Sequence, residues 1–222
     1  MCGRIKTPEE LNEIRIQLQI EDLLLDYAPR FNVPPTASVP VVTSLDGTRR
    51  LALMRWGLVP SWAKDDKIGY ATFNARADGL ATKPAFRSAW KAGRRCLVIA
   101  DGFYEWRKRD KQPYFITLGN KQPMTFAGLW EEWKSPSGPP LRSCTVITTE
   151  ANELVGAVHD RMPVIIGPEN WASWLGEEAC DPAALLAPFP PERMTLWPVS
   201  KRVGSVKNND PALTDRVDLS SA

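Results

Sequence analysis

Residues 96–106 read CLVIADGFYEW, an apolar run of five residues that passes through a polar turn into an aromatic segment. A short apolar run bounded by a turn is typical of a buried β-strand. Glu105 stands between two large aromatic side chains, surroundings that raise the pKa of a carboxyl group by desolvation. Glu105 is therefore a candidate general acid or base. The plainer alternative is an ion pair with Arg107 or Lys108 at the surface.

Short β-type runs and turns continue this pattern on both sides. The strands that we expect lie at residues 39–43, 51–56, 113–118, 124–130 and 144–149. The Gly119-Asn120 turn predicts that the strands at 113–118 and 124–130 are neighbours.

Helices are indicated by capping residues and helical spacing. Thr7 is the expected N-cap of the first helix, with Pro8 at its first position and Glu10 completing a capping box. The other helices that we expect begin near residue 151, at Pro168 with a stop at Gly176, and at Asp181-Pro182.

Composition limits the choice of protein class. The chain has 222 residues, 43% hydrophobic and 24% charged, and its formal net charge of +2 does not by itself indicate a nucleic-acid partner. Nine Trp and twenty Pro favour many short elements over a helical bundle. Without an internal repeat or a composition break, we expect one domain at residues 1–210 and a frayed, flexible tail at residues 211–222.

The four cysteines, Cys2, Cys96, Cys144 and Cys180, form no Cys-x-x-Cys pair, and His159 is the single histidine. We therefore expect neither a metal site nor a cofactor. No signal-peptide pattern and no apolar stretch approaching 18 residues is found, so a membrane partner is not expected. A reduced, cytoplasmic or nucleoid-associated protein is the interpretation that follows, with a monomer as the default.

The chain opens with Met1-Cys2-Gly3-Arg4. A residue as small as Cys at position 2 normally allows the initiator Met to be removed, which leaves a thiol and a free α-amine on neighbouring carbons of Cys2. Such a 1,2-aminothiol captures an aldehyde, because the amine forms a Schiff base and the sulfur then closes a thiazolidine ring. Acyl transfer with sulfur as nucleophile is also open. From these four residues alone, an incidental Cys2 is the plainer reading.

Aromatic and basic residues supply weaker signals. Trp62 in a Pro/Ser/Lys loop suits base stacking, although partial burial in a packing role is the commoner use of such a residue. Basic and aromatic residues alternate over residues 83–95, which suits a single-stranded nucleic-acid groove or, equally, a solvated helix face. These residues are Lys83, Phe86, Arg87, Trp90, Lys91, Arg94 and Arg95. His159 is the one group that exchanges a proton near pH 7 without a perturbed pKa, but a lone His is usually structural.

Taken in order, six segments resemble the SRAP family, the SOS-response-associated peptidase-like proteins. They are MCGR at residues 1–4, RFNV at 30–33 with Pro35, NAR at 74–76, ADGFYEW at 100–106, HDRMP at 159–163 and residues 199–210. The similarity runs over nearly the whole chain. Asp78, Ile99 and Ser205 depart from the family pattern, which affects supporting contacts and not the chemistry.

The resemblance implies a single-domain α+β fold, with short mixed and antiparallel strands in an open, barrel-like core and helices at the periphery. It also implies covalent capture of abasic sites in single-stranded DNA. By carry-over, Cys2 is the nucleophile, Asn74 orients the N-terminal amine, and Glu105 and His159 handle protons.

The same resemblance implies a set of DNA contacts. Arg4, Arg76 and Arg161 would hold the phosphates that flank the lesion. Pro35 and Trp62 match positions where bases are wedged or stacked, and Lys83 is a further expected DNA contact.

Two other functions stay open at this point. An N-terminal-nucleophile peptidase or amide hydrolase would use the Cys2 sulfur against an amide carbonyl, although no synthetase or transferase domain of the kind that amidotransferases carry is found. In a non-covalent single-strand binder, Cys2 would be incidental and salt alone would release the DNA.

Overall fold

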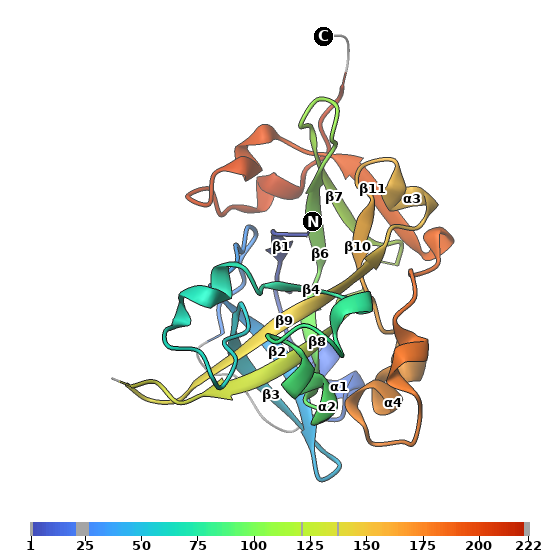
Figure 1. The fold of residues 1–222 in the computed structure, drawn as a ribbon. Helices are drawn as coiled ribbons and strands as arrows, with labels where there is room; N and C mark the ends of the chain where they lie inside the picture. Colours follow the sequence, from blue (N-terminus) through green and yellow to red (C-terminus); the bar gives the residue numbers. More distant parts are fainter. Residues whose placement is uncertain (1, 21–26, 121, 137, 220–222) are drawn as a thin grey trace.

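Two β-sheets carry the core of the molecule, and short helices lie around them (Figure 1). The computed structural model describes residues 2–20, 27–120, 122–136 and 138–219. The helices are α1 (Asn12–Gln17), α2 (Arg87–Lys91), α3 (Glu153–Gly156) and α4 (Trp171–Leu175). The strands are β1 (Ile5–Lys6), β2 (Ser38–Leu45), β3 (Thr48–Trp56), β4 (Asn74–Arg76), β5 (Arg95–Ala100), β6 (Gly102–Trp106), β7 (Pro113–Leu118), β8 (Met124–Trp133), β9 (Leu141–Glu150), β10 (Arg161–Pro163) and β11 (Met194–Pro198).

The larger sheet bends into a ring. Strand pairing runs from β9 through β3, β2, β5 and β8 and returns to β9. The β3–β9 and β2–β5 steps are each only two residue pairs long, so the ring is not a fully bonded barrel. The smaller sheet has the antiparallel order β1-β6-β7-β11. This architecture confirms the expected α+β fold with an open, barrel-like core and peripheral helices.

The apolar run of β5 is continuous because both faces of the strand are buried. Cys96, Val98 and Ala100 pack into one core cluster, whereas Leu97 and Ile99 pack into a second. A strand with cores on both sides needs no alternation of apolar and polar residues. The strand therefore separates the two main hydrophobic clusters of the molecule.

Strand β9 brings together two short strands that are far apart in the sequence. β4 pairs with it in parallel through Val146–Thr148, and β10 pairs with it antiparallel through Thr148–Glu150. Residues that are 85 positions apart in sequence, Arg76 and Arg161, are thereby brought to the same end of β9.

Most of the expected strands are confirmed, but one expected neighbour relation is wrong. β7 pairs with β6 and β11 in the smaller sheet, whereas β8 pairs with β5 and β9 in the ring. The turn between them therefore passes from one sheet to the other, and Gly119 N–H donates to the Arg193 carbonyl at 2.9 Å instead of closing a hairpin.

The first helix begins later than its sequence indicates. α1 starts at Asn12 with Leu11 as N-cap and without a side-chain cap. The Thr7 hydroxyl is used elsewhere, because its Oγ1 accepts a hydrogen bond from Arg30 N–H at 2.9 Å. Further along, Gly176 ends α4 in the left-handed conformation with φ of 84°, as expected. None of the helices in the described part of the chain is long and apolar enough to cross a membrane.

The C-terminal segment differs from the frayed tail expected at residues 211–222. Pro211–Thr214 forms a 3₁₀ helix in which Leu213 is fully buried. Val217 N–H donates to the Pro198 carbonyl at 3.0 Å, which ties the segment to the end of β11. Burial of Leu213 in an aromatic cluster with Tyr104 explains this order. Residues 220–222 of the expected tail lie outside the described residues.

Replacement of Leu213 by Ala tests this packing. The loss of a buried Leu side chain costs about 2–5 kcal/mol of unfolding free energy. Leu219 is 47% exposed and lies six positions further on, so Leu219→Ala is the matched control and should change the free energy by less than about 0.5 kcal/mol. Urea unfolding measures both, and equal effects of the two substitutions would contradict a packed C-terminal segment.

Candidate functional site

Near the start of the chain, strand β1 is held between strand β6 on one side and Val33 on the other. Ile5 pairs with Phe103 of β6, and Tyr104 N–H donates to the Arg4 carbonyl at 2.9 Å. On its other side, Ile5 exchanges backbone hydrogen bonds with Val33 at 2.8 and 3.2 Å. These bonds place the residues immediately before Ile5 in a fixed position over the core.

Cys2 lies inside the protein, and Asn74 and Glu105 lie around it. Only 1% of Cys2 is exposed. The side-chain amide of Asn74, at the start of β4, donates to the Cys2 carbonyl at 2.7 Å. The Oδ1 atom of Asn74 is buried and accepts no hydrogen bond from the described residues. Glu105 of β6 is 2% exposed and close enough for its charge to act on the Cys2 thiol.

Burial shifts the ionisation of both Cys2 and Glu105. It raises the pKa of the Cys2 thiol well above its ordinary value, and the charge of Glu105 raises that pKa further. Burial also raises the pKa of Glu105, from an ordinary 4.5 to about 6. At neutral pH the thiol is therefore protonated and Glu105 is mostly ionised. A carboxylate beside a protonated thiol is placed to take its proton.

His159 lies two residues before the start of β10. Its Nδ1 accepts the Arg161 N–H at 3.1 Å and lies 2.9 Å from a carboxylate oxygen of Asp160. Burial lowers the pKa of the imidazole, and Asp160 opposes this shift. The Asp160 charge also raises the pKa of Glu105. Asp160 thus links His159 and Glu105 electrostatically.

The arginines at the end of β9 each have a partner within the chain. Arg161 donates to the carbonyl and the hydroxyl of Thr148 at 2.6 and 3.0 Å. Arg76 forms a two-point ion pair with Asp78 at 2.8 and 3.0 Å, and both side chains are more than half exposed. The positive charge of Arg76, together with burial, lowers the pKa of Arg161. This end of β9 therefore carries two adjacent cations.

Arg4 is more deeply engaged than the other two arginines. Its guanidinium donates to Asn32 Oδ1 at 2.8 Å and to the Val203 carbonyl at 3.0 Å. Asn32 is fully buried, and its amide nitrogen donates to the carbonyls of Val203, Ser205 and Asn208 at 3.0–3.1 Å. Asn32 therefore fastens the first strand to the segment at residues 203–208.

Trp62 and Lys83 lie on neighbouring loops at the surface. Trp62 is 55% exposed, and its indole N–H donates to the Pro84 carbonyl at 3.4 Å. Trp62 is therefore partly buried, and a large part of its ring faces solvent. Pro35 is half-buried in a loop whose next residue, Thr36, donates its N–H to the Trp56 carbonyl at 2.6 Å.

The family resemblance pointed to Arg4 and Arg161, but the sequence analysis missed Asn32 and Thr148, which accept hydrogen bonds from them. Asn32 is part of the RFNV segment, and its position inside an otherwise apolar run was the available signal. No local signal marks Thr148, because its contact with Arg161 depends on strand pairing. Within the described residues, no group of three or more His, Cys, Asp or Glu side chains could hold a metal ion.

The fold and this buried N-terminal site together define a class of protein, and comparison with known families identifies it. The sequence model of the family described as SOS response associated peptidase (SRAP) matches residues 1–206. The chain therefore belongs to the SRAP family.

Relatives of known name and structure agree with this assignment. The chain is 43% identical to abasic site processing protein YoqW of Bacillus subtilis, over 97% of this chain and 99% of YoqW. It is 36% identical to abasic site processing protein HMCES of Gallus gallus, over 98% of this chain and 71% of HMCES. A crystal structure of a Bacteroides thetaiotaomicron protein superposes with a TM-score of 0.87 at 25% identity, covering 97% of this chain and all of that one.

The raised pKa of Glu105 predicts a pH-dependent stability. The pKa of Glu105 is higher in the folded state than in the unfolded state. Its contribution to the free energy of unfolding is therefore fully present below about pH 4.5 and is lost as the pH rises through about 6. The full shift corresponds to about 2 kcal/mol. Glu105→Gln should therefore gain about 2 kcal/mol relative to wild type between about pH 4.5 and pH 7.5.

Urea unfolding of both proteins at each pH measures this difference. The exposed Glu192, replaced by Gln, is the control and should show no comparable gain. A pH-independent difference between Glu105→Gln and wild type would contradict a buried carboxyl with a raised pKa.

Proposed function

We propose that this protein captures abasic sites in single-stranded DNA as a covalent adduct on Cys2. The observation that carries the proposal is the arrangement at the chain start, where Asn74 fixes the Cys2 carbonyl and Glu105 lies beside the thiol. The YoqW and HMCES relatives, named abasic site processing proteins, support the substrate class.

Removal of Met1, which lies outside the described residues, would expose the α-amine of Cys2. An abasic deoxyribose equilibrates with an open-chain aldehyde. The amine adds to this aldehyde, and loss of water gives an iminium ion. The thiol then adds to the iminium carbon and loses its proton, which closes a five-membered thiazolidine ring. Without ring closure, the iminium would promote β-elimination and cleavage of the strand.

The ionisation of the site fits this order of events. A thiol whose pKa is raised by burial stays protonated while the amine reacts first. Ring closure then needs a base, and Glu105, with a pKa of about 6, is ionised at neutral pH and adjacent. His159 and Asp160 would support proton transfer during opening of the sugar ring. Reversal of the adduct follows the same steps backwards, with Glu105 returning the proton to sulfur.

The DNA strand is proposed to lie across the end of β9. Arg76 and Arg161 supply adjacent positive charges there, and Arg161 Nε is buried without an acceptor among the described residues. Trp62 offers an exposed ring for a base. Pro35 and Lys83 would complete the path, and Arg4 would reach a phosphate only with the donors that Asn32, Val203 and Gly204 leave free.

A peptidase or amide hydrolase is the second candidate, because the family description itself includes a peptidase and Glu105 could equally activate the thiol for acyl transfer. Its signature would be amide hydrolysis, for example of glutamine or of the Met1–Cys2 bond, that continues without DNA.

Replacement of Cys2 by Ser tests the thiazolidine. An oxazolidine hydrolyses readily, so Cys2→Ser should form no product that survives boiling in detergent. The measurement is a denaturing gel of Met-trimmed protein mixed with single-stranded DNA that carries one abasic site. Cys180→Ser, at an exposed cysteine, is the control and should crosslink like wild type. A heat-stable Cys2→Ser adduct would rule out the proposed ring.

Replacement of Asn74 by Ala tests positioning. Loss of the hydrogen bond to the Cys2 carbonyl should slow adduct formation by about 10²-fold, because reacting atoms must be held in near-attack geometry. Affinity for DNA with a tetrahydrofuran analogue, which has no aldehyde, should stay unchanged. Quenched time courses give the rate, and fluorescence anisotropy gives the affinity. An equal loss in both would assign Asn74 to DNA binding.

A further inference from the structure

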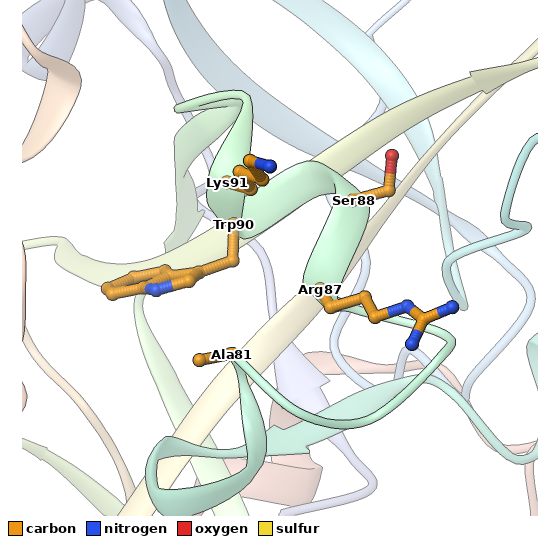
Figure 2. A pocket seen from close by; sticks show the side chains of 5 residues that line it. All are labelled: Ala81, Arg87, Ser88, Trp90 and Lys91. Atoms are coloured by element: carbon orange, nitrogen blue, oxygen red, sulfur yellow. The ribbon is translucent and has the colours of Figure 1, made fainter.

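A surface pocket lies on α2, and none of the residues proposed to react at Cys2 lines it. It has a volume of about 550 Å³ and is lined by Ala81, Arg87, Ser88, Trp90 and Lys91 (Figure 2). α2 is anchored beneath the pocket by buried Ala89 and by the ring contact of Trp90 with Trp174, whose centroids are 6.5 Å apart. The pocket therefore has a rigid base.

The polar side chains that line this pocket are mainly hydrogen-bond donors. Arg87 and Lys91 carry donors only, and within the described residues their side chains form neither a hydrogen bond nor an ion pair. The indole N–H of Trp90 also has no acceptor in the described part of the chain. The Ser88 hydroxyl accepts a hydrogen bond from Arg94 at 3.2 Å and can still donate its own proton. A ligand for this pocket must bring acceptors and negative charge.

The spacing of these groups suits an extended ligand. Arg87 and Lys91 are four positions apart, on the same face of the helix. Figure 2 shows the Trp90 indole and the Arg87 guanidinium extending in opposite directions, with Ala81 on the preceding segment below the helix. A ligand with a phosphate near Arg87 and Lys91 and a flat ring against Trp90 would bind to both parts of the pocket. A nucleotide has both groups.

The pocket continues the surface on which Trp62 and Lys83 lie. The indole N–H of Trp62 reaches the Pro84 carbonyl, three residues before Arg87. Lys83 N–H donates to the Gly79 carbonyl and the Lys83 carbonyl accepts from Arg87 N–H, at 2.9 and 3.0 Å, so one hydrogen-bonded turn joins Lys83 to α2. The exposed aromatic ring and the basic residues thus form a connected path.

We propose that this α2 pocket is a second contact for the single-stranded DNA, occupied by a nucleotide that flanks the captured lesion. This inference rests on the proposed function for the identity of the strand. Arg87 and Lys91 contact its phosphates, and Trp90 stacks on a base. The pocket contributes to affinity and takes no part in the bond-forming steps at Cys2.

Equilibrium binding to DNA with a tetrahydrofuran site tests the pocket independently of the chemistry. The variant is Arg87→Ala/Lys91→Ala, and the probes carry flanks of about 2 or about 12 nucleotides on each side of the site. On the long probe, we expect about tenfold weaker binding and a salt dependence flatter by about 1.4, the value for two lost phosphate contacts on a single strand. On the short probe, binding should equal that of wild type.

The control is Arg50→Ala/Arg109→Ala, which removes the same charge from two exposed positions elsewhere on the surface. It should bind both probes like wild type. If the two double variants behave alike on the long probe, the pocket does not contact DNA.

Photocrosslinking locates the contact directly. A strand with 5-iodouracil moved stepwise along either flank should give a crosslinked peptide that contains Trp90 at one distance from the site. Absence of any such peptide would overturn the proposal. Adduct formation on a true abasic site is measured in parallel. Binding through α2 without adduct formation would contradict the proposed function but not the pocket, whereas adduct formation without binding through α2 would contradict only the pocket.

Discussion

The backbone pairing of β1 with β6 and with Val33 is the constraint on which the site depends. Ordering a chain terminus costs about 1–2 kcal/mol per residue in backbone entropy. The hydrogen bonds on both sides of Ile5 and its complete burial offset this cost. Because the strand is fixed, Cys2 lies inside the protein, where the Asn74 amide can hold its carbonyl. A reactive group at a frayed terminus would have no such geometry.

The same burial sets the electrostatics of the site. It stabilises the neutral forms of the Cys2 thiol and of Glu105, and the charge of Glu105 further disfavours ionisation of the thiol. When a proton moves from the Cys2 thiol to the ionised Glu105, the pair still carries one negative charge. The transfer therefore adds no buried charge. A buried thiol is therefore compatible with nucleophilic chemistry here, provided that Glu105 lies beside it.

The sequence alone predicted the structural features that depend on local patterns of residues. The continuous apolar run of β5 and the glycine stop of α4 follow from local patterns, and both are confirmed. The division of β7 and β8 between two sheets, the use of Thr7 outside a helix cap and the packing of Leu213 depend on contacts between distant segments, and local patterns missed them. The site divides in the same way. Family resemblance supplied the residues that we propose to react, whereas the Asn32 and Thr148 contacts depend on how distant segments pack together.

The internal partners of Arg76 and Arg4 suggest different tasks for the two side chains. The Arg76–Asp78 pair is exposed, and such pairs contribute at most about 1 kcal/mol, so a phosphate can replace Asp78 at little cost. Arg4 instead donates to Oδ1 of the buried Asn32, an acceptor that would lose this donor if Arg4 turned away. Arg76 is thus suited to exchange between protein and DNA partners, and Arg4 to holding the first strand in place. Asp78, where the family pattern has Glu, forms a two-point ion pair with Arg76 at the surface.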